Sequence, residues 1–269
     1  MLAAFGVLVS TSVFGQAPAV SRQSRLPEFE VASVRPSGSN LREVNGFYTY
    51  EGGRIVGHGC TIEYLVMIAY NVQRFQISGA PGWTKMSNEE RFDLEAKPPE
   101  SSRSSHWETS SPKNYPGEEE RQMLQSLMAE RFKLQVHREV GQGPVFILRL
   151  GAKGKKLKLT PSKDKTVYSW AGSIGGVLPG GDGLRGMNIS IREFAVRLSS
   201  WLERPVTDET GLQGAFDFEF HSGEEDVNSN IDVTTSIVSS LKGVGLNLSP
   251  AKGPVETIVI DHVERPSEN

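Results

Sequence analysis

The 269-residue sequence contains almost no cysteine, because Cys60 is the only one. A single thiol cannot form an intramolecular disulfide, nor can it build a zinc or iron–sulfur site that needs several thiolates. An excess of charge of one sign is also absent, since 29 basic and 32 acidic residues leave a formal net charge of −3. This balance excludes the basic footprint of a nucleic-acid-binding or anionic-membrane-binding domain. We therefore expect no nucleic-acid partner.

Long hydrophobic runs are missing except near the start of the chain, where an uncharged apolar run covers Leu2–Phe14. The run is too short for a membrane span, which needs about 20 residues, and its length is typical of an export signal. Val13 and Gly15 predict cleavage after Gly15, so residues 1–15 form a signal peptide and residues 16–28 a flexible mature N-terminus. No Lys or Arg precedes the run, and a buried N-terminal helix is the alternative. We expect a periplasmic or secreted protein without a membrane span in the mature chain.

The residues that remain are those of a mixed globular protein, with 37% hydrophobic and 23% charged residues. In the first half, Thr61 is predicted to cap a helix, and Phe92, Leu94 and Ala96 alternate with acidic residues as in a half-buried strand. The pattern then predicts a surface linker, a second helix and two strands joined by a glycine turn. These elements cover Lys97–Gly117, the segment from Glu118, Phe132–Val136, the turn Gly141–Gly143 and Val145–Leu150.

The second half repeats this order after a glycine-rich stretch, Gly172–Gly186, in which we interpret Gly175–Gly183 as a mobile connection. Ser190 and Glu193 have the spacing of a capping box at the start of an amphipathic helix. The elements that follow are a strand at Phe216–Phe220, a helix that carries Ile237 and Leu241, a turn at Lys252–Gly253 and a strand at Val255–Val263.

Two sequence matches support a relation between the halves. Arg91–Glu95 (RFDLE) resembles Ala215–Glu219 (AFDFE), and Gly-Pro-Val occurs at 143–145 and again at 253–255. We predict an α+β fold of two related halves, 29–160 with the linker-like insertion 97–117 and 166–264, followed by a tail at 265–269. Each half would place helices on one face of a largely antiparallel sheet, and the pair would be an internal duplication. The alternative is two unrelated α+β stretches.

Two groups of residues are candidates for catalysis. Asp93 and Glu95, like Asp217 and Glu219, are carboxylates two positions apart on a strand, but alternation alone turns such residues outward. His58 and Cys60 resemble an activated thiolate pair, yet a lone cysteine before an apolar helix is typical of a core position. We therefore assign no catalytic residue and predict that Cys60 is packed and chemically quiet.

The sequence also contains candidate metal and cofactor motifs. No two of the five histidines, His58, His106, His137, His221 and His262, have the spacing of a helical metal site, so no metal is predicted. Gly151–Leu157 and Gly175–Gly183 fit neither a phosphate loop nor a dinucleotide fingerprint, so no cofactor is predicted. Asp208–Gly211 resembles an interrupted Asp-Thr-Gly motif, and we interpret it as a turn in which Asp208 or Thr210 bonds nearby backbone.

Five ordered motifs carry a family resemblance: Phe29–Pro36, Ala69–Gly79, Glu130–Glu139, Arg204–Glu219 and Pro254–Asn269. Together they resemble an acidobacterial-expanded family of exported proteins built on a domain of unknown function. Some members of that family carry the domain behind a membrane metallopeptidase of the antibiotic-sensor type. The resemblance implies an extracytoplasmic sensing or regulatory part and no assigned catalytic residue.

The function predicted from the sequence is an exported, non-enzymatic binding or sensory module of the cell envelope. Its partner would be an envelope protein, a peptide or a wall-derived ligand, with binding residues that the sequence does not identify. A secreted or periplasmic hydrolase is one alternative, which would need a deep pocket with perturbed titratable groups. An envelope-assembly domain resembling the N-terminal modules of secretins and receptors is another, by fold-level analogy.

Overall fold

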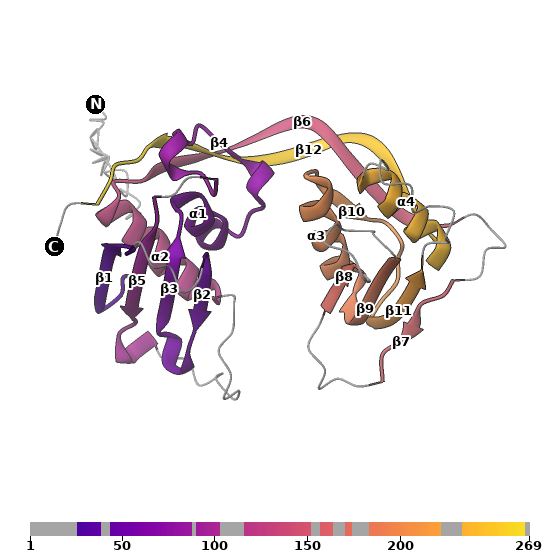
Figure 1. The fold of residues 1–269 in the computed structure, drawn as a ribbon, viewed down its shortest axis with the longest axis horizontal. Helices are drawn as coiled ribbons and strands as arrows, with labels where there is room; N and C mark the ends of the chain where they lie inside the picture. The colour runs from indigo at the N-terminus through magenta and orange to yellow at the C-terminus, as the bar shows by residue number, and fades with distance from the viewer. Residues whose placement is uncertain are drawn as a thin grey trace, which may run out of the picture.

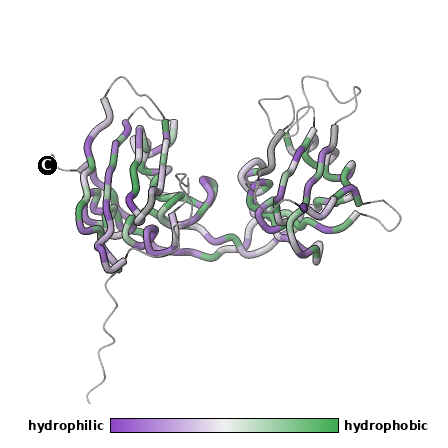
Figure 2. Tube along the Cα trace, turned by 90° about the horizontal axis from the view of Figure 1, so that it is seen from below, coloured by the Kyte–Doolittle hydropathy of each residue, from purple (hydrophilic) through white to green (hydrophobic). Residues whose placement is uncertain are grey.

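Two lobes joined along one side by a two-stranded ribbon make up the molecule (Figure 1). The computed structural model describes residues 26–38, 44–87, 90–102, 116–151, 157–163, 170–173, 183–221 and 233–266. The ribbon consists of β6 (Gln135–Leu150) and β12 (Leu246–His262). Figure 2 shows the same arrangement from below, with the lobes side by side and the ribbon running between them. The fold is α+β with mainly antiparallel sheets, as the sequence predicts.

The first lobe is a four-stranded antiparallel sheet in the order β1-β5-β3-β2 with two helices packed against it. Its strands are β1 (Val31–Pro36), β2 (Gly46–Thr49), β3 (Ile55–Cys60) and β5 (Phe92–Lys97), and its helices are α1 (Ile62–Tyr70) and α2 (Glu118–Arg131). Short 3-10 turns lie at η1 (Glu51–Gly53), η2 (Arg74–Gln76), η3 (Gly82–Thr84) and η4 (Glu100–Ser102).

The two predicted helices of this lobe and the strand at Phe92 are present, whereas the strand predicted at Phe132–Val136 begins only at Gln135. The Thr61 hydroxyl accepts a hydrogen bond from the Tyr64 N–H at 3.3 Å and caps α1. Phe92, Leu94 and Ala96 are buried between half-buried Asp93 and exposed Glu95. The apolar stripe of α2 faces the interior, because burial of one face is what stabilises an amphipathic helix.

The second lobe has the sheet order β7-β11-β9-β8, again antiparallel throughout. Its strands are β7 (Thr160–Pro161), β8 (Trp170–Ser173), β9 (Gly183–Ser190) and β11 (Ala215–His221), and its helices are α3 (Ile191–Leu202) and α4 (Val233–Val244). Ser190 and Glu193 form the predicted capping box.

Of the predicted connection Gly175–Gly183, only Gly183 lies within the described residues, and it begins β9. The two ends of the wider glycine-rich stretch belong to strands, because β8 ends at Ser173 and β9 continues through Gly186. Within β9, glycine at position 186 is required by the packing of the Phe218 ring. A Cβ atom there would lie 2.3 Å from Cε1 of Phe218, so only glycine lets the neighbouring ring approach.

The lobes exchange strand ends through a third sheet, ordered β10-β6-β12-β4. In lobe 1, β4 (Ile77–Ser78) pairs in parallel with the end of β12, and in lobe 2, β10 (Val206–Asp208) pairs in parallel with the end of β6. Ile258 and Ile260 of β12 are part of the core of lobe 1, whereas Phe146 and Leu148 of β6 are part of the core of lobe 2. Each lobe is therefore completed by a strand that starts in the other.

The turns predicted at Gly141–Gly143 and at Lys252–Gly253 are wrong, because both segments lie inside the continuous ribbon and Gly143 is paired with Gly253. At each of the two glycines, a valine side chain of the partner strand packs where a Cβ atom would lie. A Cβ on Gly143 would lie 2.9 Å from Cγ2 of Val255, and a Cβ on Gly253 would lie 3.1 Å from Cγ2 of Val145. The repeated Gly-Pro-Val motif thus marks the middle of the ladder, where each glycine leaves room for a valine of the partner strand.

The lobes also agree in a detail of their sheets. In lobe 1 the Gly59 N–H donates to Oδ1 of Asp93 at 3.0 Å, and in lobe 2 the Asn188 N–H donates to Oδ1 of Asp217 at 2.7 Å. Gly59 and Asn188 both have a positive φ, 57° and 46°, beside an irregularity in the strand register. Together with the identical strand order, this agreement supports the hypothesis of an internal duplication.

Several predictions fall outside the described residues. They concern the signal peptide at 1–15, most of the linker at 97–117, and residues 174–182 of the glycine-rich stretch. Among the helices that the structure describes, none is long and apolar enough to cross a membrane.

Candidate functional site

A hollow of about 370 Å³ lies beside the centre of the ribbon, where parts of both lobes meet. Phe75 comes from lobe 1, and Glu203, Arg204 and Pro205 come from lobe 2. The ribbon supplies the remainder of the lining: Glu139, Gly141, Gln142, Gly143, Pro144, Val255 and Thr257.

Phe75 is positioned by the short turn η2. Gln73 and Gln76 form a reciprocal capping box across this turn. The Gln76 side chain also donates from Nε2 to the carbonyl of Glu256 at 2.9 Å. The turn is therefore attached to β12, and Phe75 is held beside the ribbon.

The lobe 2 wall follows the end of α3. Glu203 ends this helix in the left-handed conformation, with φ 50° and ψ 36°, so the chain turns sharply toward the ribbon. The Pro205 carbonyl accepts a hydrogen bond from the Phe146 N–H at 2.8 Å. The Arg204 guanidinium lies 5.7 Å from the centre of the Phe146 ring.

An ion pair joins the two walls, because Nη2 of Arg74 lies 3.7 Å from Oε1 of Glu203. Both side chains are more than half exposed, so the pair contributes about 0–1 kcal/mol. This contact therefore contributes little to the attachment of one wall to the other.

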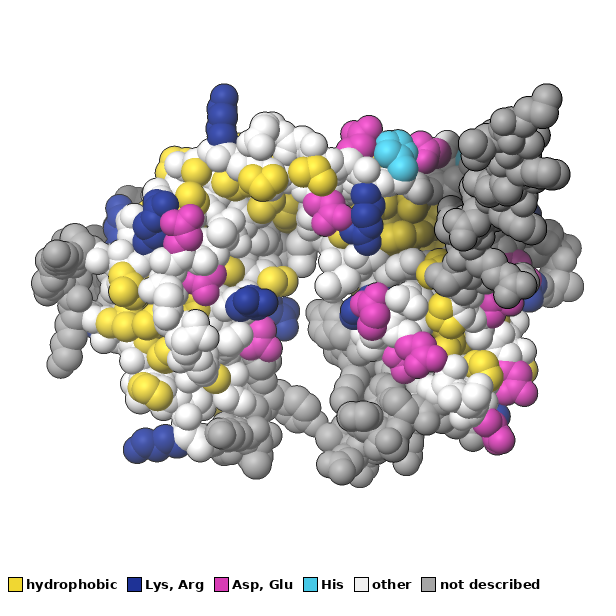
Figure 3. Space-filling model, turned by 180° about the vertical axis from the view of Figure 1, so that it is seen from behind, with side chains coloured by type: hydrophobic (Ala, Val, Ile, Leu, Met, Phe, Trp, Pro, Cys, Tyr) yellow, Lys and Arg dark blue, Asp and Glu magenta, His cyan; other side chains and the backbone are white. Residues whose placement is uncertain are grey.

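A second hollow of about 360 Å³ shares Phe75 and Glu203 with the first and extends along lobe 1. It is lined by Lys85 and by Glu63, which is buried and accepts a hydrogen bond from the Met86 N–H at 2.8 Å. Figure 3 shows acidic and basic side chains on both sides of the space between the lobes. The site therefore combines apolar surface with charge of both signs.

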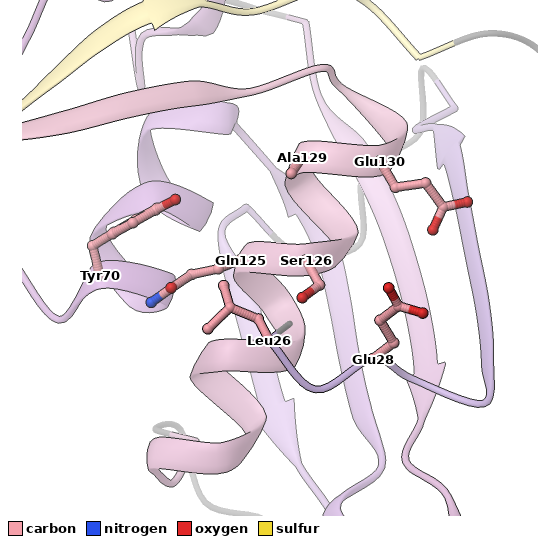
Figure 4. A pocket seen from close by; sticks show the side chains of 7 residues that line it. All are labelled: Leu26, Glu28, Tyr70, Gln125, Ser126, Ala129 and Glu130. Atoms are coloured by element: carbon pink, nitrogen blue, oxygen red, sulfur yellow. The ribbon is translucent and has the colours of Figure 1, made fainter. Parts of the chain in front are cut away.

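A groove of about 590 Å³ lies elsewhere on lobe 1, between α2, the end of α1 and residues 26–28 (Figure 4). Its central polar side chains hold the lobe together, because Gln125 donates to the Ala69 carbonyl and Ser126 to the Pro27 carbonyl, each at 2.8 Å. Burial raises the pKa of Tyr70, while the charge of Arg138 lowers it by less, so the phenol stays protonated at neutral pH. This groove belongs to one lobe alone.

The paired carboxylates have separate structural partners. Asp93 accepts hydrogen bonds from Gly59 and from the Ser37 hydroxyl, and Glu95 pairs with Arg54 at 2.8 Å. In lobe 2, Glu219 pairs with Arg185 at 3.3 Å. Each acid thus stabilises its own sheet.

His58 and Cys60 do not form a catalytic pair. Cys60 is fully buried, as predicted, and its thiol donates to the Gly46 carbonyl at 3.4 Å. The side chain of His58 is exposed, and only its backbone carbonyl lies near the sulfur, at 3.7 Å.

The exposed His137 lies between two carboxylates on the ribbon, with Nδ1 2.8 Å from Asp261 and Nε2 3.1 Å from Glu139. The hydrogen bonds with Asp261 and then Glu139 raise the pKa of His137. His262 contacts Glu264 at 2.8 Å, and His106 lies outside the described residues. Within the described part of the chain, no three His, Cys, Asp or Glu side chains come together as a metal site.

Asp208–Gly211 forms the predicted turn. Oδ1 of Asp208 accepts from the N–H and the hydroxyl of Thr210, at 2.9 and 2.7 Å, and the Thr210 hydroxyl accepts from the Leu212 N–H at 3.2 Å. The lysines of Gly151–Leu157 and most of Gly175–Gly183 lie outside the described residues.

Sequence reasoning missed the residues that line the hollow, above all Phe75, Glu203 and Arg204. The available signals were the Gln73 and Gln76 spacing, which forms a capping box, and Pro205 directly after a helix. Neither signal indicates which segment of the other lobe it will meet, because the meeting point depends on the ribbon.

Residues 63–263, well over half of the chain, match the family described as "Protein of unknown function (DUF3738)", and the chain belongs to that family. Neither the curated proteins nor the solved structures contain a match to this chain.

Proposed function

We propose that this protein is an exported binding or sensory module of the cell envelope, and that its ligand occupies the hollow beside the centre of the ribbon. The observation that carries the proposal is the convergence of Phe75 from one lobe, Arg204 from the other and the ribbon backbone on one space. Ligand sites occur preferentially where structural units meet, because each unit can contribute to recognition.

The chemistry of the lining favours a peptide or a wall-derived fragment. Phe75, Pro205 and Val255 offer apolar surface, while Arg204 and Glu203 offer opposite charges close together. A ligand with an apolar group beside polar or zwitterionic groups is complementary to such a surface. A simple anion or cation would meet charge of its own sign.

The proposed export depends on the apolar run Leu2–Phe14. A sensory role is favoured by the resemblance to an acidobacterial-expanded family in which some members carry this domain behind antibiotic-sensor-type metallopeptidases. Closure or opening of the walls around a ligand would then alter the weak Arg74–Glu203 contact.

The proposal is tested with an immobilised chain that begins at Gln16, incubated with envelope extract from the native host. Bound peptides, proteins and wall fragments are identified by mass spectrometry. We expect Phe75→Ala and Arg204→Ala to reduce retention of the ligand at least tenfold. Arg192→Ala and Val196→Ala, at exposed positions of α3, are the matched controls and should retain it. Equal retention by all four variants would contradict the proposed site.

A further inference from the structure

The edge of β6 beside the hollow presents backbone groups to which none of the described strands is paired. Phe146 donates its N–H to Pro205, and Leu148 accepts from the Glu209 N–H at 2.9 Å, so both residues direct their backbone groups away from β12. Successive residues of a strand alternate in this direction, and the β6–β12 register is unbroken here. Val140 and Gln142 therefore direct their N–H and C=O groups to the same edge. Among the described strands, β10 covers that edge only over Phe146–Leu148.

The equivalent edge of β12 is blocked by prolines. The partners of Phe146, Pro144 and Gln142 are Pro250, Lys252 and Pro254, in that order. Two of these three positions on β12 have no N–H, and proline at a strand edge prevents the addition of a further strand. The next carbonyl on that edge, that of Glu256, already accepts from Gln76.

The open edge adjoins the hollow directly. Residues 141–144 belong both to the edge strand and to the lining, and glycines at 141 and 143 leave the strand surface free of side chains. The Val140 side chain is 71% exposed. A strand placed along this edge would have side chains beside Phe75 and Arg204, because alternate residues of a strand share one face.

We infer that the ligand is an extended peptide, which adds as a strand to the edge of β6 over Arg138–Gln142 and places alternate side chains in the hollow. Backbone hydrogen bonds to Val140 and Gln142 provide the affinity, and Phe75 and Arg204 provide the selectivity, as in other cases of strand addition. The inference deepens the proposed function, on which it depends, by naming the class of ligand.

The test uses a phage-displayed library of random nonapeptides as the probe. The peptide that the full chain selects is synthesised, and its Kd is measured by fluorescence anisotropy. Gln142→Pro removes an N–H from the open edge, and this N–H makes no hydrogen bond to β12 within the ribbon. Lys252→Pro, at the equivalent position of β12, is the matched control. We expect Gln142→Pro to raise the Kd at least tenfold and Lys252→Pro to change it less than twofold.

A second measurement uses the unaltered protein, so it tests the inference even if the Gln142→Pro variant does not fold. On peptide binding, hydrogen exchange at the Val140 and Gln142 amides should slow at least tenfold, while exchange at Lys252 should not change. The inference is overturned if no nonapeptide is selected, or if binding leaves exchange at Val140 and Gln142 unchanged. A peptide that is sensitive to Phe75→Ala but not to Gln142→Pro would retain the hollow as the site and overturn strand addition. Insensitivity to both variants would overturn both proposals.

Discussion

At the scale of single residues, the acids at positions 93 and 217 satisfy backbone groups that the sheets leave without a strand partner. Each accepts an N–H from a residue with positive φ at an irregularity of the neighbouring strand. A buried or half-buried N–H without an acceptor would destabilise the fold by about 1–3 kcal/mol. The outward alternation that was expected of these carboxylates therefore describes Glu95 better than Asp93.

Burial raises the pKa of Asp93. The hydrogen bonds from Gly59 and Ser37, together with the charge of Arg35, lower the pKa by more than burial raises it, so the pKa of Asp93 lies below the ordinary carboxyl value. The charged form is thus favoured in the folded state. Its contribution to stability is complete above the pKa of the unfolded chain and is lost as the pH falls through the lower, folded pKa.

We therefore expect Asp93→Asn to lower the free energy of unfolding by about 1 kcal/mol at pH 7, and the difference from wild type to disappear in strong acid. Urea unfolding at a series of pH values measures this. Glu95→Gln, which removes an exposed ion pair, should cost less than about 0.5 kcal/mol. Equal losses for the two variants, or a loss independent of pH, would contradict the role of Asp93.

Cys60 belongs to the hydrophobic core of lobe 1, where it has no exposed surface. A thiol reagent should therefore label the native protein at neutral pH at least a hundredfold more slowly than the urea-unfolded chain. Cys60→Ala should destabilise the protein by about 1 kcal/mol through lost packing and leave ligand binding unchanged. Rapid labelling of the folded protein would count against a purely structural role.

At the scale of elements, local signals predict the helices and the two strands that begin at Phe92 and Ala215. Thr61 and Ser190 cap helices because their hydroxyls accept from the first free N–H groups. The Phe92 and Phe216 strands follow from alternation of apolar and acidic residues. Short strands such as β7 and β10 carry too few residues to show a period, so their existence depends on tertiary pairing.

The ribbon escaped prediction because glycine next to proline has two physical meanings. The Gly-Pro dipeptide is typical of turns, but it also occurs in a strand where a partner side chain packs against the glycine and the proline lies at an exposed edge. Nothing local distinguishes these meanings at Gly143. The decisive contact, with Val255, lies 112 positions further along the sequence. The site beside the ribbon could not be predicted for the same reason.

Two glycines of β6, Gly143 and Gly141, differ in the space available for a Cβ atom, so alanine should affect stability differently at each. Gly143→Ala should destabilise the protein by about 1–3 kcal/mol, because the new Cβ would lie 2.9 Å from Cγ2 of Val255. Gly141→Ala is the matched control. A Cβ there meets nothing within 4 Å, so alanine should be neutral or stabilise by about 0.5 kcal/mol. Thermal unfolding compares them, and similar behaviour of the two variants would contradict the close packing at Gly143.

At the scale of the whole molecule, strand exchange makes each lobe dependent on the other. Ile258 and Ile260 fill the core of lobe 1 but follow α4 of lobe 2 in sequence. Phe146 and Leu148 fill the core of lobe 2 but follow α2 of lobe 1. Removal of either ribbon strand would take large apolar side chains out of the distant core. The lobes therefore form one structural unit in spite of the space between them.

Export is the remaining expectation at this scale. The run Leu2–Phe14 and the Val13 and Gly15 pair predict cleavage after Gly15. Mass spectrometry of the protein from its native host should find Gln16 as the first residue in the envelope or secreted fraction. Uncleaved protein recovered from the cytosol would show that this segment is not an export signal.

The exchanged ribbon is the central claim, and a designed disulfide tests it most directly. Val140 and Glu256 are directly opposite each other, and such a pair brings Cα atoms to about 4.5–5.5 Å. Val140→Cys with Glu256→Cys should therefore form an intramolecular disulfide rapidly and in high yield. Val140→Cys with Lys252→Cys, which is displaced by four residues along the ladder, should not. If the first pair stays reduced, or if both pairs oxidise equally, the strands are not paired in the register that places Gly143 opposite Gly253, and the exchange of strands between lobes is wrong.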